Sequence, residues 1–273
     1  MAVEAAKVTG AKIIFDAHEY SPLQLENRPL WKFLYAPSVN YFLKKYKNCF
    51  DASITVCEPI AERYKREYGF SPIVIMNSPE LVVDASSGTT QNNSIKLIHH
   101  GGAFPDRKLE NMIQAVALAD QKYSLHFMLV PTYPKYLARL QQMAQELAPG
   151  RVFFHPTVPP DQIVQTISQY DIGFYLLEPK NYNSLVALPN KFFDYIAAGL
   201  AICIGPSSAM QKLVHEHQIG VVADSFQASA VAQLLNSLSP QQIDHMKKNA
   251  CKARQKLNAT IEMEKLLELY NSL

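Results

Sequence analysis

Residues 95–130 read IKLIHHGGAFPDRKLENMIQAVALADQKYSLHFMLV, and two kinds of periodicity alternate along them. The apolar runs 95–100 and 125–130 predict buried β-strands, because both are short and nearly continuous. Between them, a helical pattern extends from about Lys108 to Gln121. A strand, a helix and a second strand of these lengths form a right-handed crossover between parallel strands. This stretch therefore predicts an α/β protein with a parallel sheet.

The same alternation continues toward the C-terminus. A helical pattern covers 134–147, and four further apolar runs predict strands at 152–155, 172–177, 202–204 and 220–223. Because helical segments separate these strands, the pattern predicts a doubly wound sheet. We expect residues 95–257 to form one complete Rossmann-like domain.

The region before residue 95 is organised differently. Residues 83–94 contain almost no core-forming side chain and predict a linker. In 1–82 we expect three strands, which are few for a buried parallel sheet, and no element before the first of them. We expect this region to be a partial Rossmann-like domain whose open edge takes a partner chain or a second copy, with the C-terminal helix 258–273 packed against it. Its predicted elements are strands at 12–16, 52–56 and 73–76 and helices at 31–48 and 59–68.

The composition excludes several classes of protein. The chain has 273 residues, 48% of them hydrophobic, which is enough for a sizeable core. Its formal charge of +2 is too small for a dedicated nucleic-acid binder. The four cysteines are scattered and have no histidine at metal-ligand spacing, so we expect four ordinary thiols in a reduced, intracellular protein. No apolar run approaches about 18 residues and no signal-peptide pattern is present, which favours a cytoplasmic protein.

Gly101 and Gly102 lie at the end of a predicted strand, just before a helix. Adjacent glycines let a ligand approach the backbone closely, and the N-terminus of the following helix favours an anion such as phosphate. The spacing is not G-x-G-x-x-G, so a nicotinamide fingerprint is absent. The alternative is a glycine turn that serves only the strand-to-helix geometry.

A second candidate segment is LPNKFFDYIAAG, residues 188–199. Pro189 suits the first position of a helix. Asn190 and Asp194 then lie one turn apart on one face, with Lys191 beside them. This helix follows a predicted strand, and open α/β sheets bind ligands at the carboxyl ends of their strands. The alternative is a proline at a helix start followed by a solvent-exposed Asp–Lys pair.

Two segments of the first region also suggest contacts. The sequence DAHE at 16–19 follows the first strand, where polar side chains line a cleft or cap a turn. Residues 31–47 interleave aromatic side chains with four lysines, which suits peripheral docking on an anionic membrane, at its inner face. The alternative for 31–47 is a core helix with a basic outer face.

Five segments, in this chain order, resemble glycosyltransferase family 4, the retaining enzymes of GT-B fold. The resemblance covers nearly the whole chain, and its last segment is the most specific. Enzymes of this family also have a strand and a glycine-rich loop ahead of the first segment, which the chain does not match. The five segments are DAHE at 16–19, ASITVCE at 52–58, IMNSP at 75–79, 101–113 and 188–201.

The resemblance implies a GT-B-like protein that transfers a sugar, with retention, from a nucleotide-diphosphate sugar to a glycan or lipid-linked acceptor in polysaccharide biosynthesis. It also implies that the protein needs no metal and no bound cofactor, because the donor sugar is a substrate. Arg107 is expected to contact the diphosphate, Asp194 to bind the ribose, and His18 to reach the sugar from the acceptor side. The expected residues are His18, Glu19, Arg107 and Asp194 for catalysis, and Gly101, Gly102, Arg107, Asn183, Pro189, Asn190, Lys191 and Asp194 for donor binding.

The chain departs from the family pattern at three positions. The first acid of the E-x7-E element should fall at Val186, and Asn183 or Ser184 is the expected substitute. Ala103 stands where a second basic residue often follows the glycine loop, and the second acid, Asp194, is one methylene shorter than glutamate. Val186, Ala103 and the missing match ahead of the first segment favour an alternative: a non-catalytic nucleotide-sugar-binding remnant, or a subunit of a split enzyme that another chain completes. A sugar-nucleotide epimerase would share only the fold.

Overall fold

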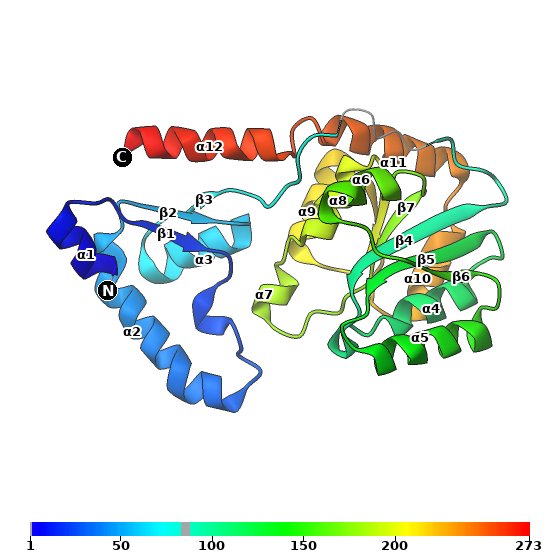
Figure 1. Ribbon diagram of the computed structural model, residues 1–273, viewed down its shortest axis with the longest axis horizontal. Helices are drawn as coiled ribbons and strands as arrows, with labels where there is room; N and C mark the ends of the chain where they lie inside the picture. Colours follow the sequence, from blue (N-terminus) through cyan, green and yellow to red (C-terminus); the bar gives the residue numbers. More distant parts are fainter. Residues whose placement is uncertain (1, 83–87) are drawn as a thin grey trace. The chain divides into compact units, whose positions relative to one another are not determined.

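A computed structural model describes residues 2–82 and 88–273, and their contacts divide the chain into two compact units (Figure 1). Each unit contains a parallel sheet with helices in the crossover connections, so the α/β prediction is confirmed. Unit 1 comprises Met1–Asn77, Pro179–Leu188 and Ala259–Leu273, and unit 2 comprises Ser78–Glu178 and Pro189–Asn258.

Unit 2 contains a six-stranded parallel sheet in the order β6-β5-β4-β7-β8-β9. The predicted strands are all present, because short continuous apolar runs suit strands covered on both faces. The chain starts in the middle of the sheet at β4, adds β5 and β6 on one side, and then crosses to β7 on the other side. The strands are β4 (Ile95–Gly102), β5 (Tyr123–Val130), β6 (Val152–His155), β7 (Ile172–Tyr175), β8 (Ala201–Ile204) and β9 (Gly220–Val222).

Two groups of helices cover the faces of this sheet (Figure 1). The first group packs on the face that presents Leu125, Phe127 and Leu129 of β5, and together they form the main hydrophobic core. This group consists of α4 (Glu110–Leu118), α5 (Pro134–Leu147) and α10 (Ala228–Asn236). The second group consists of α6 (Ile163–Ile167), α8 (Asn190–Ala197), α9 (Ser208–His217) and α11 (Pro240–Ala253).

Unit 1 contains a smaller parallel sheet in the order β1-β2-β3. Its core gathers aromatic side chains around the fully buried Tyr20 and Tyr64. Gly69 ends α3 with φ 83°, as expected for a glycine just after a helix. The elements are β1 (Ile14–Ala17), α2 (Ala36–Tyr46), β2 (Ala52–Thr55), α3 (Glu58–Tyr68) and β3 (Ile73–Val74).

One expectation about the first strand is wrong. Helix α1 (Ala2–Thr9) precedes β1, although the sequence analysis expected no element there. Its sequence, AVEAAKVT, buries none of its side chains, which explains why apolar periodicity did not reveal it. Among the described residues β1 pairs only with β2, so its other edge is unpaired.

The predicted linker 83–94 lies partly outside the described residues, which exclude 83–87. Its described part is attached to unit 2 rather than free. The Lys247 ammonium donates to the Gly88 carbonyl at 2.6 Å and forms a buried ion pair with Asp171 at 2.9 Å. The Thr90 N–H donates to the Asp244 carboxylate at 2.9 Å. Polar residues at 88–94 thus form buried contacts that a composition-based linker prediction does not anticipate.

Two segments from later in the chain belong to unit 1. Helix α12 (Ala259–Ser272) joins it through Glu262, whose fully buried carboxylate accepts the Met76 N–H at 2.9 Å. The second segment, Pro179–Leu188, contains the short helix α7 (Tyr182–Leu185). The sequence analysis placed this second segment within 95–257, whereas its contacts group it with unit 1.

Candidate functional site

The switch in strand order places the candidate site between the carboxyl ends of β4 and β7. In open parallel sheets the connections diverge at this point and leave room for a ligand. Gly101 lies at the end of β4 with φ 117°, a backbone conformation that residues with a side chain rarely adopt. The predicted glycine turn is therefore present, and its backbone faces a side chain from α8.

That side chain is Lys191. A Cβ atom added to Gly101 would lie 3.0 Å from the Lys191 amine, so the glycine lets the end of this side chain lie close over the strand end. Lys191 is only 8% exposed, and it makes no hydrogen bond or ion pair with any other residue that the structure describes. Its closest aromatic neighbour is Tyr175, whose ring centroid lies 5.5 Å away. The alternative of a solvent-exposed Asp–Lys pair is therefore wrong for Lys191.

Burial sets the charge state of Lys191. Desolvation, and then the nearby Arg107 guanidinium, lower its pKa to about 7, while Asp194 acts in the opposite direction. An isolated ammonium in such a place is unfavourable unless an anion compensates it. The site therefore has a position that an anionic ligand would stabilise.

Asp194 lies one turn further along α8 and faces His100 of β4. Its carboxylate is 3.4 Å from the His100 Nε2, which has no hydrogen-bond partner. Burial raises the pKa of Asp194 to about 6, partly opposed by Lys191, and lowers the pKa of His100 to about 3. His100 is thus a neutral imidazole at neutral pH, and its Nε2 is available to a ligand or to Asp194.

Close packing of α8 on the sheet holds these groups in place. A Cβ atom on Gly173 of β7 would lie 2.2 Å from the Tyr195 ring, so glycine is required for this approach. The Tyr195 ring in turn packs edge-on against His100, with ring centroids 5.5 Å apart. Helix α8 begins at Asn190, with Pro189 as its N-cap, one residue later than the sequence analysis placed it. Asn190 is exposed.

Arg107 reaches the same region from the turn after the glycines. It ends a short 3₁₀ turn, and its guanidinium lies 4.8 Å from the Phe104 ring centroid. Lys108 follows in a left-handed conformation and pairs with Glu178 at 2.7 Å. Ala103, where the family has a basic residue, is completely buried in the core, so a charge there would be buried without a partner.

The sequence analysis missed two residues of this site, His100 and Tyr175. Both belong to predicted strands, and alternation along a strand does not show which polar side chain faces a ligand. His99 is buried as well: its Nδ1 lies 2.9 Å from the Phe174 carbonyl, and its Nε2 has no partner. Burial lowers the pKa of His99 well below its usual value.

The structure places the other predicted site residues in unit 1. His18 and Glu19 follow β1 directly and are exposed, and the His18 Nε2 lies 3.3 Å from the Asp16 carboxylate. They therefore lie at the carboxyl end of the unit 1 sheet, and within this unit their side chains are exposed to solvent. Gly101, Gly102, Arg107, Lys191 and Asp194 are together in unit 2.

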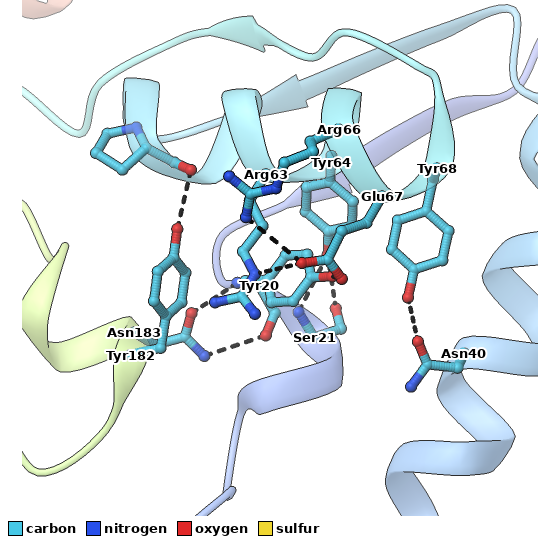
Figure 2. A network of polar contacts seen from close by, with 11 residues as sticks. Tyr20, Ser21, Asn40, Arg63, Tyr64, Arg66, Glu67, Tyr68, Tyr182 and Asn183 are labelled. Atoms are coloured by element: carbon cyan, nitrogen blue, oxygen red, sulfur yellow. Dashed lines mark hydrogen bonds and ion pairs between the residues drawn. The ribbon is translucent and has the colours of Figure 1, made fainter.

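Asn183 bridges two backbone groups of unit 1 (Figure 2). Its side-chain carbonyl accepts the Tyr20 N–H at 2.8 Å, and its amide donates to the Tyr20 carbonyl at 3.2 Å. Because this buried amide binds the Tyr20 backbone through both its oxygen and its nitrogen, Asn183 has a structural role in unit 1, and the sugar contact expected of it stays a prediction.

The surroundings of Val186 disfavour the acid that the family pattern has at this position. Val186 is 3% exposed and belongs to the unit 1 core with Tyr20, Cys57 and Ile60. Its carbonyl accepts the Cys57 thiol at 3.3 Å. A carboxylate at this position would be buried among apolar side chains without a partner, which strongly disfavours its charged form. Ser184, the other expected substitute, caps α7 by accepting the N–H groups of Lys180 and Asn181.

Two of the cavities formed by the described residues lie in unit 2. One, of about 550 Å³, opens at the carboxyl ends of β8 and β9 and includes Glu178, Asp224 and Gln227 in its lining. The other, of about 680 Å³, lies among α9, β9, α10 and α11 and contains none of the predicted site residues. In the described residues, no group of three or more His, Cys, Asp or Glu side chains could hold a metal ion.

Comparison with known proteins identifies relatives of this arrangement. Residues 118–268, more than half of the chain, match the family model described as "Glucosyltransferase 3-like, C-terminal domain". No curated protein matches the sequence.

Solved structures with low sequence identity share the fold. The Anabaena protein Alr3699/HepE, solved with UDP, is 13% identical with a TM-score of 0.78, over 100% of this chain and 75% of its own. Its UDP-glucose complex is 14% identical with a TM-score of 0.74, over the same shares. A glycosyltransferase from Rickettsia africae is 12% identical with a TM-score of 0.67, over 99% of this chain and 79% of its own. These similarities confirm a GT-B glycosyltransferase fold.

Proposed function

The chain belongs to the glucosyltransferase 3-like family, and from this premise we propose that it is a retaining glycosyltransferase that uses a nucleotide-diphosphate sugar. The acceptor in this proposal is a glycan or a lipid-linked glycan in polysaccharide biosynthesis. The observation that carries the proposal is the buried Lys191 ammonium, unpaired in the described chain, over the glycine end of β4. The solved UDP and UDP-glucose complexes of HepE support a donor of this class.

The geometry fits stabilisation of a leaving diphosphate. When the bond between the sugar C1 and the phosphate oxygen breaks, negative charge grows on the diphosphate. Lys191 and Arg107 are two cationic groups at the strand ends, and the absence of a side chain on Gly101 lets the Lys191 amine lie close to the end of β4. Fixed donors in a water-poor site stabilise developing charge without rearranging during the reaction. In this proposal no metal takes part, and the two cations replace it.

The remaining polar groups suit the other parts of the donor. Asp194, partly exposed and facing His100, is the acceptor that we assign to the ribose hydroxyls. His18 and Glu19 are exposed at the end of the unit 1 sheet, and we assign them to the acceptor side. The family match and the structural similarities do not favour the alternative of a non-catalytic remnant or split subunit.

The first test is thermal unfolding of the chain with UDP, GDP, ADP and their sugar conjugates. A ligand at about 100 times its dissociation constant should add about 2.7 kcal/mol to the free energy of unfolding, which shifts the melting temperature by a few degrees. We expect a shift with one nucleotide class, and loss of that shift in Lys191→Met but not in Lys135→Met, a control at an exposed lysine of α5.

Transfer is then measured with the selected donor and a panel of glycan and lipid-linked acceptors. Retention predicts a product with the anomeric configuration of the donor, which NMR of the product resolves. An inverted product would refute the retaining mechanism. A cooperative melt that no nucleotide shifts would refute donor binding altogether.

A further inference from the structure

The segment between Glu26 and Asp51 in unit 1 has an unusual composition. Residues 27–50 contain no acidic residue, five basic residues and seven aromatic residues. From sequence alone this pattern fits either a core helix with a basic outer face or a membrane-binding surface. The burial of its side chains distinguishes the two. The basic residues are Arg28, Lys32, Lys44, Lys45 and Lys47, and the aromatic residues are Trp31, Phe33, Tyr35, Tyr41, Phe42, Tyr46 and Phe50.

The structure exposes most of the large apolar side chains of this segment. A π-helical turn (Trp31–Tyr35) leads into α2, and Leu43 is the only buried residue of α2. Phe33 is 73% exposed, and Phe42 is 54% exposed. The core-helix interpretation is therefore wrong for this face. We define the aromatic face as Leu30, Phe33, Leu34, Tyr35, Tyr41 and Phe42, all of which are more than half exposed.

Contacts with the rest of unit 1 fix which side of α2 faces outward. Leu43 packs into the unit 1 core. On the same inward side, Asn40 accepts a short hydrogen bond from the Tyr68 hydroxyl, as Figure 2 shows. Lys47, just after the helix, donates to the Tyr68 carbonyl at 2.9 Å. Because these contacts hold the inner side, the aromatic face is turned away from the core by the fold itself.

The positive charges lie next to the exposed rings. The Lys45 ammonium lies 5.5 Å from the Tyr41 ring centroid and 5.3 Å from that of Tyr46. Lys44 is exposed beside it. Glu4 of α1 is close enough for the charge of Lys45 to act on it, but Glu4 already pairs with Lys7 at 3.0 Å. The surface therefore combines apolar rings with cations that no acid of 27–50 neutralises.

We propose that this face docks on an anionic lipid bilayer. Aromatic rings and leucines would enter the boundary between headgroups and acyl chains, while the lysines reach anionic headgroups. Lysines are depleted in the buried centre of protein interfaces, which favours a lipid partner over a protein. The docking is peripheral, since no helix in the described chain is long and apolar enough to cross a membrane. This binding is independent of the donor site.

Vesicle flotation tests the proposal directly. The complete 273-residue chain is mixed with vesicles of phosphatidylcholine alone, or with about one-third phosphatidylglycerol. We expect clear enrichment on the anionic vesicles and weak binding to the neutral ones. Each lysine near an anionic surface contributes roughly fivefold to binding, so Lys44→Gln with Lys45→Gln should weaken it by about 30-fold. Phe33→Ser with Phe42→Ser should weaken it by at least about tenfold.

A matched control separates lipid binding from general stickiness. Helix α12 of unit 1 also exposes apolar side chains, including Leu267 at 60%, but its sequence has three glutamates and one lysine. Leu267→Ser should leave vesicle binding unchanged. All variants are first compared by circular dichroism melts, so that a misfolded variant is excluded.

Two results would overturn the proposal. One is equal recovery of the chain with anionic and neutral vesicles, or with none. The other is concentration-dependent self-association, seen by light scattering without lipid, that Phe33→Ser with Phe42→Ser abolishes, because a second copy would then cover the face. Nucleotide binding is measured on the same samples, and its loss would concern the proposed function and not this one.

Discussion

The carboxyl ends of the two parallel sheets differ in how their polar groups are surrounded. At the end of β4 in unit 2, Lys191, His100 and Asp194 are withdrawn from water, and burial shifts the pKa of each. At the end of β1 in unit 1, His18 and Asp16 lie 3.3 Å apart, with about half or more of each side chain exposed. A charge in the first place therefore interacts strongly with a ligand, and a charge in the second is screened by solvent.

The difference has a structural origin. In unit 2, helices cover both faces of the six-stranded sheet, and α8 packs on β7 and β8 and places Lys191 over the end of β4. In unit 1, β1 has no strand partner on one edge among the described residues, and Asp16, His18 and Glu19 at its carboxyl end are exposed. In the proposed function, the buried side chains at the end of β4 hold the charged sugar donor in one geometry. The exposed side chains at the end of β1 meet the acceptor as it arrives from solvent.

Removing the buried cation should have the largest effect. Lys191→Met should weaken nucleotide-diphosphate binding by about 10- to 100-fold, because a charge-assisted contact to phosphate is lost. Transfer should fall by about 10²–10³-fold if the cation stabilises the leaving group. Calorimetry with the diphosphate gives the affinity. The free chain should not become less stable, since an unpaired buried charge is removed; a large drop in melting temperature would instead mean that Lys191 supports the fold.

The second largest expected effect is a change of nucleotide-diphosphate affinity with pH. The pKa of Lys191 is about 7 in the free chain, so the ammonium loses its proton as the pH rises through 7. Diphosphate affinity should fall with rising pH, by up to tenfold per pH unit between 7 and 9, because binding then requires uptake of one proton. Lys191→Arg, whose side chain remains charged, should abolish this slope. A flat profile in the original chain would contradict a titrating Lys191.

In unit 1, the corresponding change acts on stability and not on binding. Asn183→Ala removes both hydrogen bonds to the Tyr20 backbone and leaves two buried backbone groups unpaired. The expected loss is about 1–3 kcal/mol of unfolding free energy, measured by urea denaturation. Nucleotide affinity should be unchanged. A large loss of nucleotide affinity with normal stability would support the donor contact that the sequence analysis expected of Asn183.

The smallest effect is expected at the exposed end of β1. His18→Ala removes an exposed pair with Asp16 and should change the unfolding free energy by no more than about 0.5 kcal/mol. Nucleotide affinity should also be unchanged, while transfer to acceptor should fall if His18 acts on the acceptor side. Full transfer by His18→Ala would remove it from the catalytic set.

Most of the fold could be predicted because its signals are local. Apolar runs such as 152–155 and glycines such as Gly69 act through backbone conformation and alternation of side chains, which depend on near neighbours in sequence. Helix α1 escaped prediction for the same reason, since it buries nothing and so has no apolar stripe. The sequence also predicted that Gly101 and the Pro189–Asp194 segment lie at the carboxyl edge of the sheet, because each follows a predicted strand, and the structure brings Gly101 and Lys191 together there.

By itself, the sequence determined the order of strands and helices, the parallel sheet and the segments that flank its carboxyl edge. Only the tertiary structure decided which polar side chains lose contact with water. Lys191 of α8 and Asn183 of α7 are polar residues close together in the sequence, yet one has no partner in the described chain and lies over Gly101, while the other binds the Tyr20 backbone. Burial and pairing arise from contacts between residues far apart in the chain, such as the 163 positions between Tyr20 and Asn183. The pattern of neighbouring residues in the sequence does not predict such contacts.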